Sequence, residues 1–391
     1  MSDQQLQDLM ALAHAGDANA QLQVGEYLLE KKDYDTALPW FKMSSDSGNV
    51  QAGVRANALG YDFQIGQNGK EKDEQLAFKL YEVSTECGNT TGMNNYAWCF
   101  CNGVGTACDR DKAYQWWKKA TDLGDAWAMA QLGWCYENGS GITADMTLAA
   151  TYYFKSFFFG NYQQYKDKFI SLNIEPNPQL LQKDEILWLA NFYSATGFGG
   201  TKPTNVDAAF RWNKVAAIYG DTHAMINVSD YYINGWGTEV NKDKSLEYLK
   251  MADEKGNWSA TEELISQYRG QLTHKKVEKD DEIALQYALK IINSIDNQRS
   301  RYENAYRAAY DICIKLQKYQ QAATIWKEKA KRGYGKAIWG IEEIAEFYEE
   351  QQNIEEAIFF YQEILEQTDD QKDLYKRERA KAEERIRVLR G

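Results

Sequence analysis

The sequence has little proline and little histidine: four Pro and three His among 391 residues. So few prolines, together with 14 % aromatic residues, indicate a helical and well-packed chain rather than a disordered one. The histidines, His14, His223 and His274, lie far apart in the sequence. No G-x-S-x-G, H-E-x-x-H or Walker motif occurs either. We therefore expect no catalytic residues and predict that the protein is not an enzyme.

An excess of positive charge and long apolar runs are also lacking. The formal net charge of -12 argues against nucleic acid as a partner and fits a basic protein partner better. No run of about 18 apolar residues occurs, so we expect no membrane span; even TYYFKSFFFG is interrupted by Lys155. The first 20 residues have neither the basic start nor the apolar stretch of a signal peptide. These absences predict a cytoplasmic protein.

The six cysteines follow no disulfide-like or zinc-like spacing. Cys87, Cys99, Cys101 and Cys108 fall within 22 residues, but structural zinc sites usually use paired C-x2–4-C motifs. A C-x-C pair on a helix points its two thiols in different directions. Cys99 and Cys135 are 36 residues apart and share one position of a repeat. We expect reduced packing thiols, no metal and no cofactor, with a redox or metal role for the group of four left open.

An internal repeat dominates the chain. Gly88, Gly124 and Gly160 are 36 residues apart, and Asn or Asp follows each of them. Each repeat has an apolar segment of helical period, a Gly-x-Gly loop and a second helical segment rich in Ala, Trp and Tyr. The same corner recurs at Gly16, Gly48, Gly220 and Gly256, with a degenerate copy at Gly333. Glycine suits the left-handed end of a helix and Asn or Asp caps the next one, so the pattern predicts stacked helix pairs.

Two motifs in this repeat resemble a known family. AMAQLGWCYENGSG (128–141) fits A-x-x-x-L-G-x-x-Y-x-x-G-x-G, and DRDKAYQWWKKA (109–120) fits D-x-x-K-A-x-x-W-x-x-K-A. Both patterns resemble the Sel1-like repeat, an α/α relative of the tetratricopeptide repeat. The resemblance covers nearly the whole chain. It implies an all-α, right-handed superhelical solenoid whose first helices line a concave groove, and an adaptor or scaffold without enzymatic activity.

Irregularities in the repeat suggest a division of the chain. Residues 1–270 form the predicted Sel1-like array, with an insertion at about 161–183 that contains Pro176 and Pro178. After Gly270 the Gly-x-Gly loop disappears, and 271–391 are expected to form tetratricopeptide-like helix pairs closed by a charged helix at 373–389. In total we expect about nine helix pairs and a C-terminal capping helix.

Candidate binding residues follow from the resemblance. Groove-facing positions of tetratricopeptide-like first helices correspond here to offsets 3, 10 and 14 from each corner glycine, which share one helical face. The residues at these positions are Thr91, Trp98 and Asn102 in the third repeat, Trp127, Trp134 and Asn138 in the fourth, Asn191 in the fifth, and His223, Asp230 and Asn234 in the sixth. Aromatic rings supply contact area and amides bond an extended backbone. The alternative for Asn102, Asn138 and Asn234 is that they merely cap their helices.

The sequence leaves two main hypotheses for the function of the protein. The preferred hypothesis is a monomeric adaptor that binds a protein or peptide partner in the groove. The alternative is an immunity protein or antitoxin that sequesters a bacterial effector, suggested by the acidic charge and the broad concavity. An enzymatic or regulatory use of the thiol group is the least favoured hypothesis.

Overall fold

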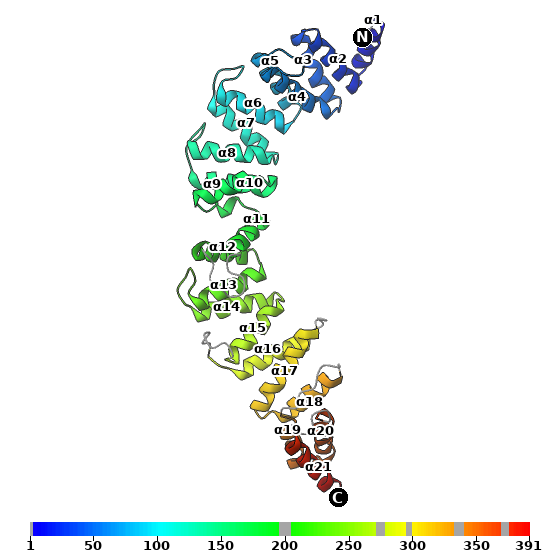
Figure 1. Ribbon diagram of the computed structural model, residues 1–391, viewed down its shortest axis with the longest axis vertical. Coiled ribbons are helices and arrows are strands. Elements are labelled where there is room, and N and C mark those ends of the chain that lie inside the picture. The colour runs from blue at the N-terminus through cyan, green and yellow to red at the C-terminus, as the bar shows by residue number, and fades with distance from the viewer. Residues whose placement is uncertain (1–2, 195–204, 271–277, 295–298, 332–339, 369–374) are drawn as a thin grey trace. The chain divides into compact units, whose positions relative to one another are not determined.

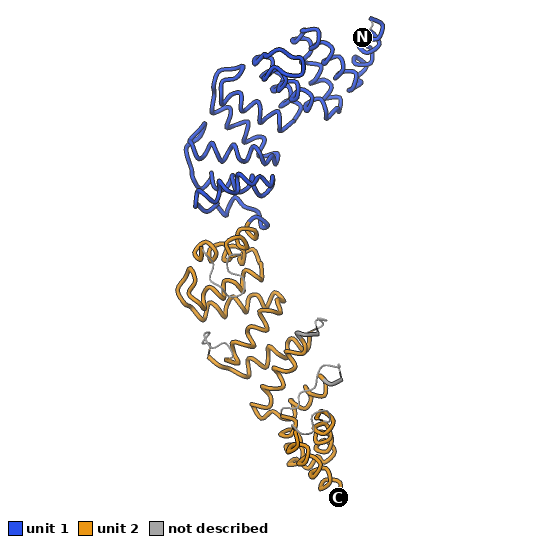
Figure 2. The backbone as a smooth tube through the Cα atoms, viewed as in Figure 1, with its two compact units in different colours: residues 1–185 blue, residues 186–391 orange. Residues whose placement is uncertain are grey.

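The computed structural model describes the chain except for residues 1–2, 195–204, 271–277, 295–298, 332–339 and 369–374 (Figure 1). Every regular element of the described part is a helix, which confirms the all-α prediction. The helices group into two compact units, residues 1–185 and residues 186–391 (Figure 2). The corner at Gly333 lies outside the described residues.

The first unit is a stack of antiparallel helix pairs. Its helices are α1 (Asp3–His14), α2 (Ala18–Glu30), α3 (Tyr34–Asp46), α4 (Gln51–Ile65), α5 (Glu74–Glu86), α6 (Thr90–Asn102), α7 (Arg110–Asp122), α8 (Ala126–Asn138), α9 (Met146–Gly160) and α10 (Gln163–Leu172). Within each repeat the two helices lie side by side, as in α6 with α7 and α8 with α9. Successive pairs then stack, α5 on α6 and α7 on α8. This is the arrangement of an α/α solenoid.

The second unit continues the pattern of consecutive packed helices. After α11 (Lys183–Ser194), which begins just before it, come α12 (Val206–Ile218), α13 (Thr222–Asn234), α14 (Lys242–Glu254), α15 (Trp258–Tyr268), α16 (Asp281–Ile292), α17 (Arg299–Lys315), α18 (Tyr319–Lys331), α19 (Ile341–Glu350), α20 (Ile354–Gln367) and α21 (Lys376–Arg390). The charged helix α21 packs on α20 and buries Ala382. Its Lys381 pairs with Glu342 and Glu346 of α19. The predicted capping helix is therefore present.

The repeat corners adopt the expected geometry. Their glycines have φ between +76° and +95°: Gly16, Gly48, Gly88, Gly124, Gly220 and Gly256. The next side chain usually accepts one of the free N–H groups in the first turn of the following helix, as Asp125 does from Ala128 at 2.8 Å. Gly160 departs from the prediction, because α9 runs through it and Asn161 takes the left-handed conformation with φ of +52°.

The buried core repeats with the same period. In the first unit a buried ring follows the recurrent alanine of each second helix by four residues: Phe41, Tyr81, Trp117 and Tyr153. In three repeats this ring lies against a glycine of the first helix, and a Cβ there would come within 2.9 Å of it: Gly25, Gly60 and Gly133. The absence of a side chain at these positions therefore lets the paired helices approach closely.

The Gly-x-Gly loop joins neighbouring repeats. Its first glycine ends the first helix in the left-handed conformation, as Gly139 ends α8. Its second glycine lies against the start of the preceding repeat's second helix. A Cβ at Gly141 would be 2.1 Å from the carbonyl oxygen of Arg110, and one at Gly105 would be 2.0 Å from that of Glu74. The loop thus has a packing role that requires the absence of a side chain.

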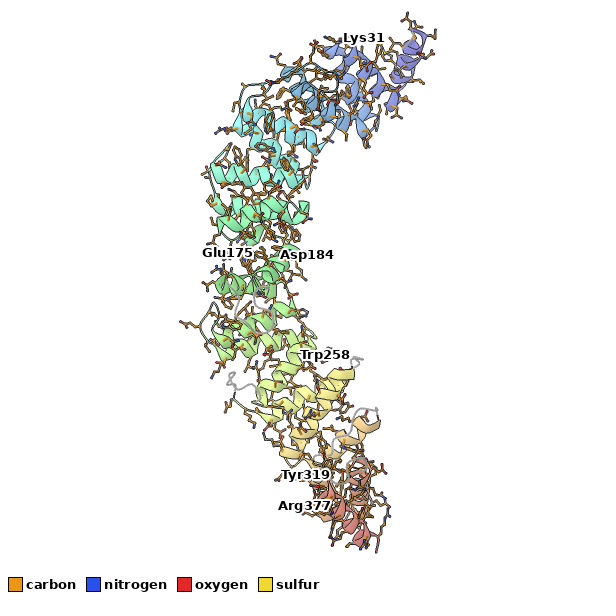
Figure 3. The ribbon with its side chains drawn as sticks, viewed as in Figure 1. Lys31, Glu175, Asp184, Trp258, Tyr319 and Arg377 are labelled. Carbon is orange, nitrogen blue, oxygen red and sulfur yellow. The ribbon has the colours of Figure 1, made fainter. Side chains whose placement is uncertain are left out.

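The surplus residues at 161–183 form ordered structure. They contain α10 and a single 3-10 turn, η1 (Pro178–Leu180). Figure 3 labels Glu175, which precedes this turn in the sequence, and Asp184, which follows it. α10 packs on α9, and its Lys168 donates to Glu137 Oε1 of α8 at 2.6 Å. The backbone N–H of Asn177 donates to Thr151 Oγ1 at 2.8 Å. The insertion therefore adds a helix to the fourth repeat.

Candidate binding site

A pocket of ≈ 370 Å³ opens among the first helices of three successive repeats in the first unit. Four aromatic residues line it: Tyr61 of α4, Trp98 of α6, Trp117 of α7 and Trp127 of α8. Four amide residues complete the lining: Gln64 of α4, Asn94 and Asn95 of α6, and Gln131 of α8. None of these eight side chains is formally charged. We call this site the aromatic–amide pocket.

The tryptophans of the pocket differ in exposure. Trp117 is 2 % exposed and belongs to the core, whereas Trp98 and Trp127 are 41 % and 42 % exposed. The Trp127 ring meets the rings of Tyr162 and Tyr165 edge-on, with centroids 5.9 Å away in both cases. An indole held by neighbouring rings loses little conformational freedom when a ligand covers it. Trp127 therefore offers preformed apolar surface to a partner, and Trp98 adds a second exposed ring.

Hydrogen bonds fix several of the amides and leave one buried oxygen without a partner. Asn94 Nδ2 donates to Asp125 Oδ1 at 2.9 Å. Because the Asp125 carboxylate can only accept, this bond assigns the amide nitrogen to the Asp125 side. Asn94 Oδ1 is then directed elsewhere, and it is buried without a hydrogen-bond partner. The Asn94 side chain as a whole is only 7 % exposed.

The other amides are held by protein partners as well. Asn95 Nδ2 donates to Asn57 Oδ1 at 2.8 Å, and the Tyr81 hydroxyl donates to Gln64 Oε1 at 2.6 Å. Burial raises the pKa of Tyr81 well above its ordinary value, so this hydroxyl remains a donor at neutral pH. The amide nitrogen of Gln64 is thereby turned away from Tyr81.

Two of the ten predicted binding residues, Trp98 and Trp127, meet in this pocket. Thr91 is exposed in the first turn of α6 but does not line the pocket. Trp134 is 36 % exposed and packs edge-on against Trp117, with ring centroids 6.5 Å apart, outside the lining. The structure therefore separates Trp134 from the pair with which it was predicted.

The predicted asparagines at offset 14 have a local role. Each donates its amide N–H to the backbone carbonyl four residues earlier: Asn102 to Trp98 at 2.9 Å, Asn138 to Trp134 at 3.0 Å and Asn234 to Asp230 at 2.8 Å. These bonds satisfy carbonyls at the ends of α6, α8 and α13, as the capping alternative requires. Their use in partner binding stays a prediction.

The remaining predicted residues belong to the second unit. Asn191 is exposed on α11, His223 is exposed near the start of α13, and Asp230 is half-buried on α13. None of them lines the aromatic–amide pocket. Their role in binding stays untested.

Sequence reasoning missed six lining residues, and two signals could have found several of them. Asn95 and Gln131 lie at offset 7, which falls on the same helical face as offsets 3, 10 and 14. Tyr61 does not fall on these offsets because the second repeat, from Gly48 to Gly88, is longer than 36 residues. Gly60 faces the Tyr81 ring as Gly133 faces the Tyr153 ring, so the two glycines are equivalent positions of their repeats. Tyr61, which follows Gly60, is therefore equivalent to Trp134, which follows Gly133.

Most of the cysteine side chains are buried or half-buried. Cys99 and Cys135 are buried, and burial raises the pKa of each to about 12. Burial also raises the pKa of Cys87 and of Cys101. Cys108 is exposed, and its Sγ donates to the Cys101 carbonyl at 3.2 Å. Within the described ranges no group of three His, Cys, Asp or Glu side chains is placed to hold a metal ion.

No helix among the described residues has the length and apolar character needed to span a bilayer.

Paired helices joined by glycine corners and stacked in series define an α/α repeat protein. A family model for the Sel1 repeat matches seven segments, 18–49, 56–89, 90–125, 128–156, 222–257, 267–294 and 346–369, which together make up more than half of the chain. The chain belongs to the Sel1 repeat family. Sel1 repeat proteins generally mediate protein–protein interactions, and the repeats are generally non-catalytic.

Solved structures with detectable similarity include two bacterial proteins. A Sel1 repeat protein from Oxalobacter formigenes is 24 % identical, with 69 % of this chain and 98 % of that chain covered and a TM-score of 0.28. A protective antigen of uropathogenic Escherichia coli with an SLR fold is 20 % identical, with 92 % and 71 % covered and a TM-score of 0.31. No curated protein matches the sequence.

Proposed function

We propose that the protein is a non-enzymatic adaptor that binds an extended segment of a partner protein in the aromatic–amide pocket. One observation carries the proposal: Trp98 and Trp127 expose ring surface beside Asn94, whose buried amide oxygen has no partner among the described residues. A buried acceptor of this kind costs about 1–3 kcal/mol while it stays unsatisfied. A ligand donor would remove that cost.

The chemistry of the lining suits a peptide. Its amides and indoles offer both donors and acceptors, which an extended backbone can match, and its rings offer apolar area. Tryptophan is enriched among the few residues that dominate binding energy at interfaces. Removing one such ring from a real interface costs about 2 kcal/mol or more, which corresponds to roughly a thirty-fold loss of affinity.

A displayed library of random peptides, selected against the full chain, tests the proposal. We expect selected peptides to bind Trp98→Ala and Trp127→Ala at least about thirty-fold more weakly than the parent. The matched control is Tyr219→Ala, which removes an aromatic side chain of similar exposure, 47 %, from the second unit. Peptides that bind a folded Trp98→Ala/Trp127→Ala double variant as tightly as the parent would exclude this pocket as the binding site.

A further inference from the structure

We propose that the aromatic–amide pocket takes a basic side chain, lysine or arginine, from the bound segment. This inference rests on the proposed function and adds the chemistry of the partner. It follows from three properties of the pocket: rings without a cation, an acceptor without a donor, and a charge balance of the surrounding unit that favours a cation.

Some aromatic rings of the chain have a lysine over them, but the rings of the pocket do not. Elsewhere, lysines of the chain itself lie over ring faces: Lys119 is 4.6 Å from the Trp116 centroid, and Lys112 is 5.3 Å from that of Phe100. Among the described residues no such cation lies over Tyr61, Trp98, Trp117 or Trp127. Tryptophan is the strongest of the aromatic side chains in attracting a cation. The pocket thus holds two exposed indole rings, Trp98 and Trp127, over which no described Lys or Arg lies.

The unsatisfied oxygen of Asn94 points to a ligand that donates hydrogen bonds. Ammonium and guanidinium groups have several donors and no acceptor, so either one satisfies Asn94 Oδ1 without leaving a new acceptor unpaired. On its other side the Asn94 amide donates to the Asp125 carboxylate at 2.9 Å. A carboxylate bonded to the amide nitrogen polarises the amide and makes its oxygen a better acceptor for a cation.

The charge around the pocket favours the same ligand. No Lys, Arg or His lines it, and α6, which contributes three lining residues, has no charged side chain. In residues 1–185 Asp and Glu outnumber Lys and Arg. A basic side chain would therefore be attracted by the unit as a whole and meet no repelling group in the pocket.

The competing occupant is a neutral polar side chain, which could also donate to Asn94. Arginine and citrulline have nearly the same shape, and both donate through N–H groups, but only arginine is charged. They distinguish the two occupants without changing the size of the ligand. Citrulline has a carbonyl oxygen where arginine has a guanidinium nitrogen, so a comparison of the two probes reports on the charge and on the donors that come with it.

The experiment uses the full chain labelled with 5-fluorotryptophan and observed by fluorine NMR. Trp98→Phe and Trp127→Phe assign the two pocket signals among those of the 12 tryptophans. N-acetyl-arginine-N-methylamide, or its lysine counterpart, should shift both signals, and the citrulline counterpart should bind about ten-fold more weakly. Asn94→Ala should reduce the arginine response several-fold. Because this variant also loses a bond to α8, Gln131→Ala, which keeps that bond, serves as a second pocket variant.

The outcomes separate this inference from the proposed function. Equal responses to the arginine and citrulline probes would overturn the basic-ligand inference. So would selected peptides that require Trp98 and Trp127 but keep their affinity when each Arg or Lys is replaced by citrulline or norleucine, a result that would leave the adaptor function standing. Peptides that lose pocket binding on that replacement support the inference.

Discussion

Asn94 and Asp125 connect the pocket to a repeat corner through one 2.9 Å hydrogen bond. The same Asp125 Oδ1 accepts the N–H of Ala128 at 2.8 Å and so caps α8. A residue that the repeat uses to start a helix therefore also orients the amide at the pocket. Because one carboxylate serves both roles, the packing of the repeats and the geometry of the site cannot vary independently.

Replacing Asp125 tests this double role. Asp125→Ala removes the cap and the partner of Asn94, and we expect it to lower the free energy of unfolding by about 1–2 kcal/mol. Asp125→Asn keeps an acceptor oxygen at the cap and should cost about half as much or less. Urea unfolding followed by tryptophan fluorescence measures both variants. Equal losses for the two substitutions would show that the cap oxygen is not what matters at this position.

The Gly-x-Gly loop offers a matched pair of substitutions. Gly139→Ala places a side chain at φ of +64° with its nearest neighbour 3.6 Å away, so only backbone strain of about 1 kcal/mol is expected. Gly141→Ala adds a contact of 2.1 Å with the Arg110 carbonyl to the same strain. We expect it to cost about 3 kcal/mol or more, because the loop must move away from α7. Similar unfolding midpoints for the two variants would contradict the packing role of Gly141.

Glu185 should give stability a pH dependence. Its side chain is fully buried, with Lys155 Nζ 3.7 Å from Oε1 and the Gln182 N–H bonded to Oε2. Burial outweighs these interactions and raises the pKa of Glu185. A carboxyl with a raised pKa binds its proton more readily in the folded state, so ionising it destabilises the fold. Stability should therefore rise as pH falls through the raised pKa towards the ordinary value near 4.3.

The matched variant for this prediction is Glu185→Gln, which keeps an acceptor for the Gln182 N–H. It should unfold at higher urea concentration than the parent at pH 7, and the difference should shrink as the pH is lowered towards about 4.5. The difference between the two curves isolates Glu185 from the other titrating groups. A difference that stays constant across this range would contradict the assignment.

Thiol reactivity should follow burial. Alkylation with iodoacetamide at pH 8 should modify exposed Cys108 first, and Cys108→Ser should abolish this fast phase. Cys99 and Cys135, with pKa values raised to about 12, and Cys313, raised to about 11, should react only when the chain is unfolded in urea. Peptide mass spectrometry locates each modification. Rapid labelling of Cys99 in the native protein would contradict its burial.

The sequence alone determined the helix pairs, because the start and end of each helix depend on interactions between residues close together in the sequence. A corner glycine such as Gly124 needs only positive φ, and Asp125 needs only the free N–H groups of the next helix. The period of the apolar residues then predicts which face of each helix is buried. Trp98 and Trp127 were predicted as binding residues from the resemblance to tetratricopeptide-like units, and both side chains are exposed.

Tertiary structure decided what the repeats build together. Trp134 packs against Trp117, whereas Trp98 and Trp127 line the same pocket. This difference depends on how three helix pairs stack, and the period of residues within one repeat does not specify it. The unpartnered oxygen of Asn94 likewise exists only because Asp125 of the next repeat holds the amide nitrogen. Periodicity predicts the face of a helix, but a pocket is made by side chains from several helices and needs their packing in three dimensions.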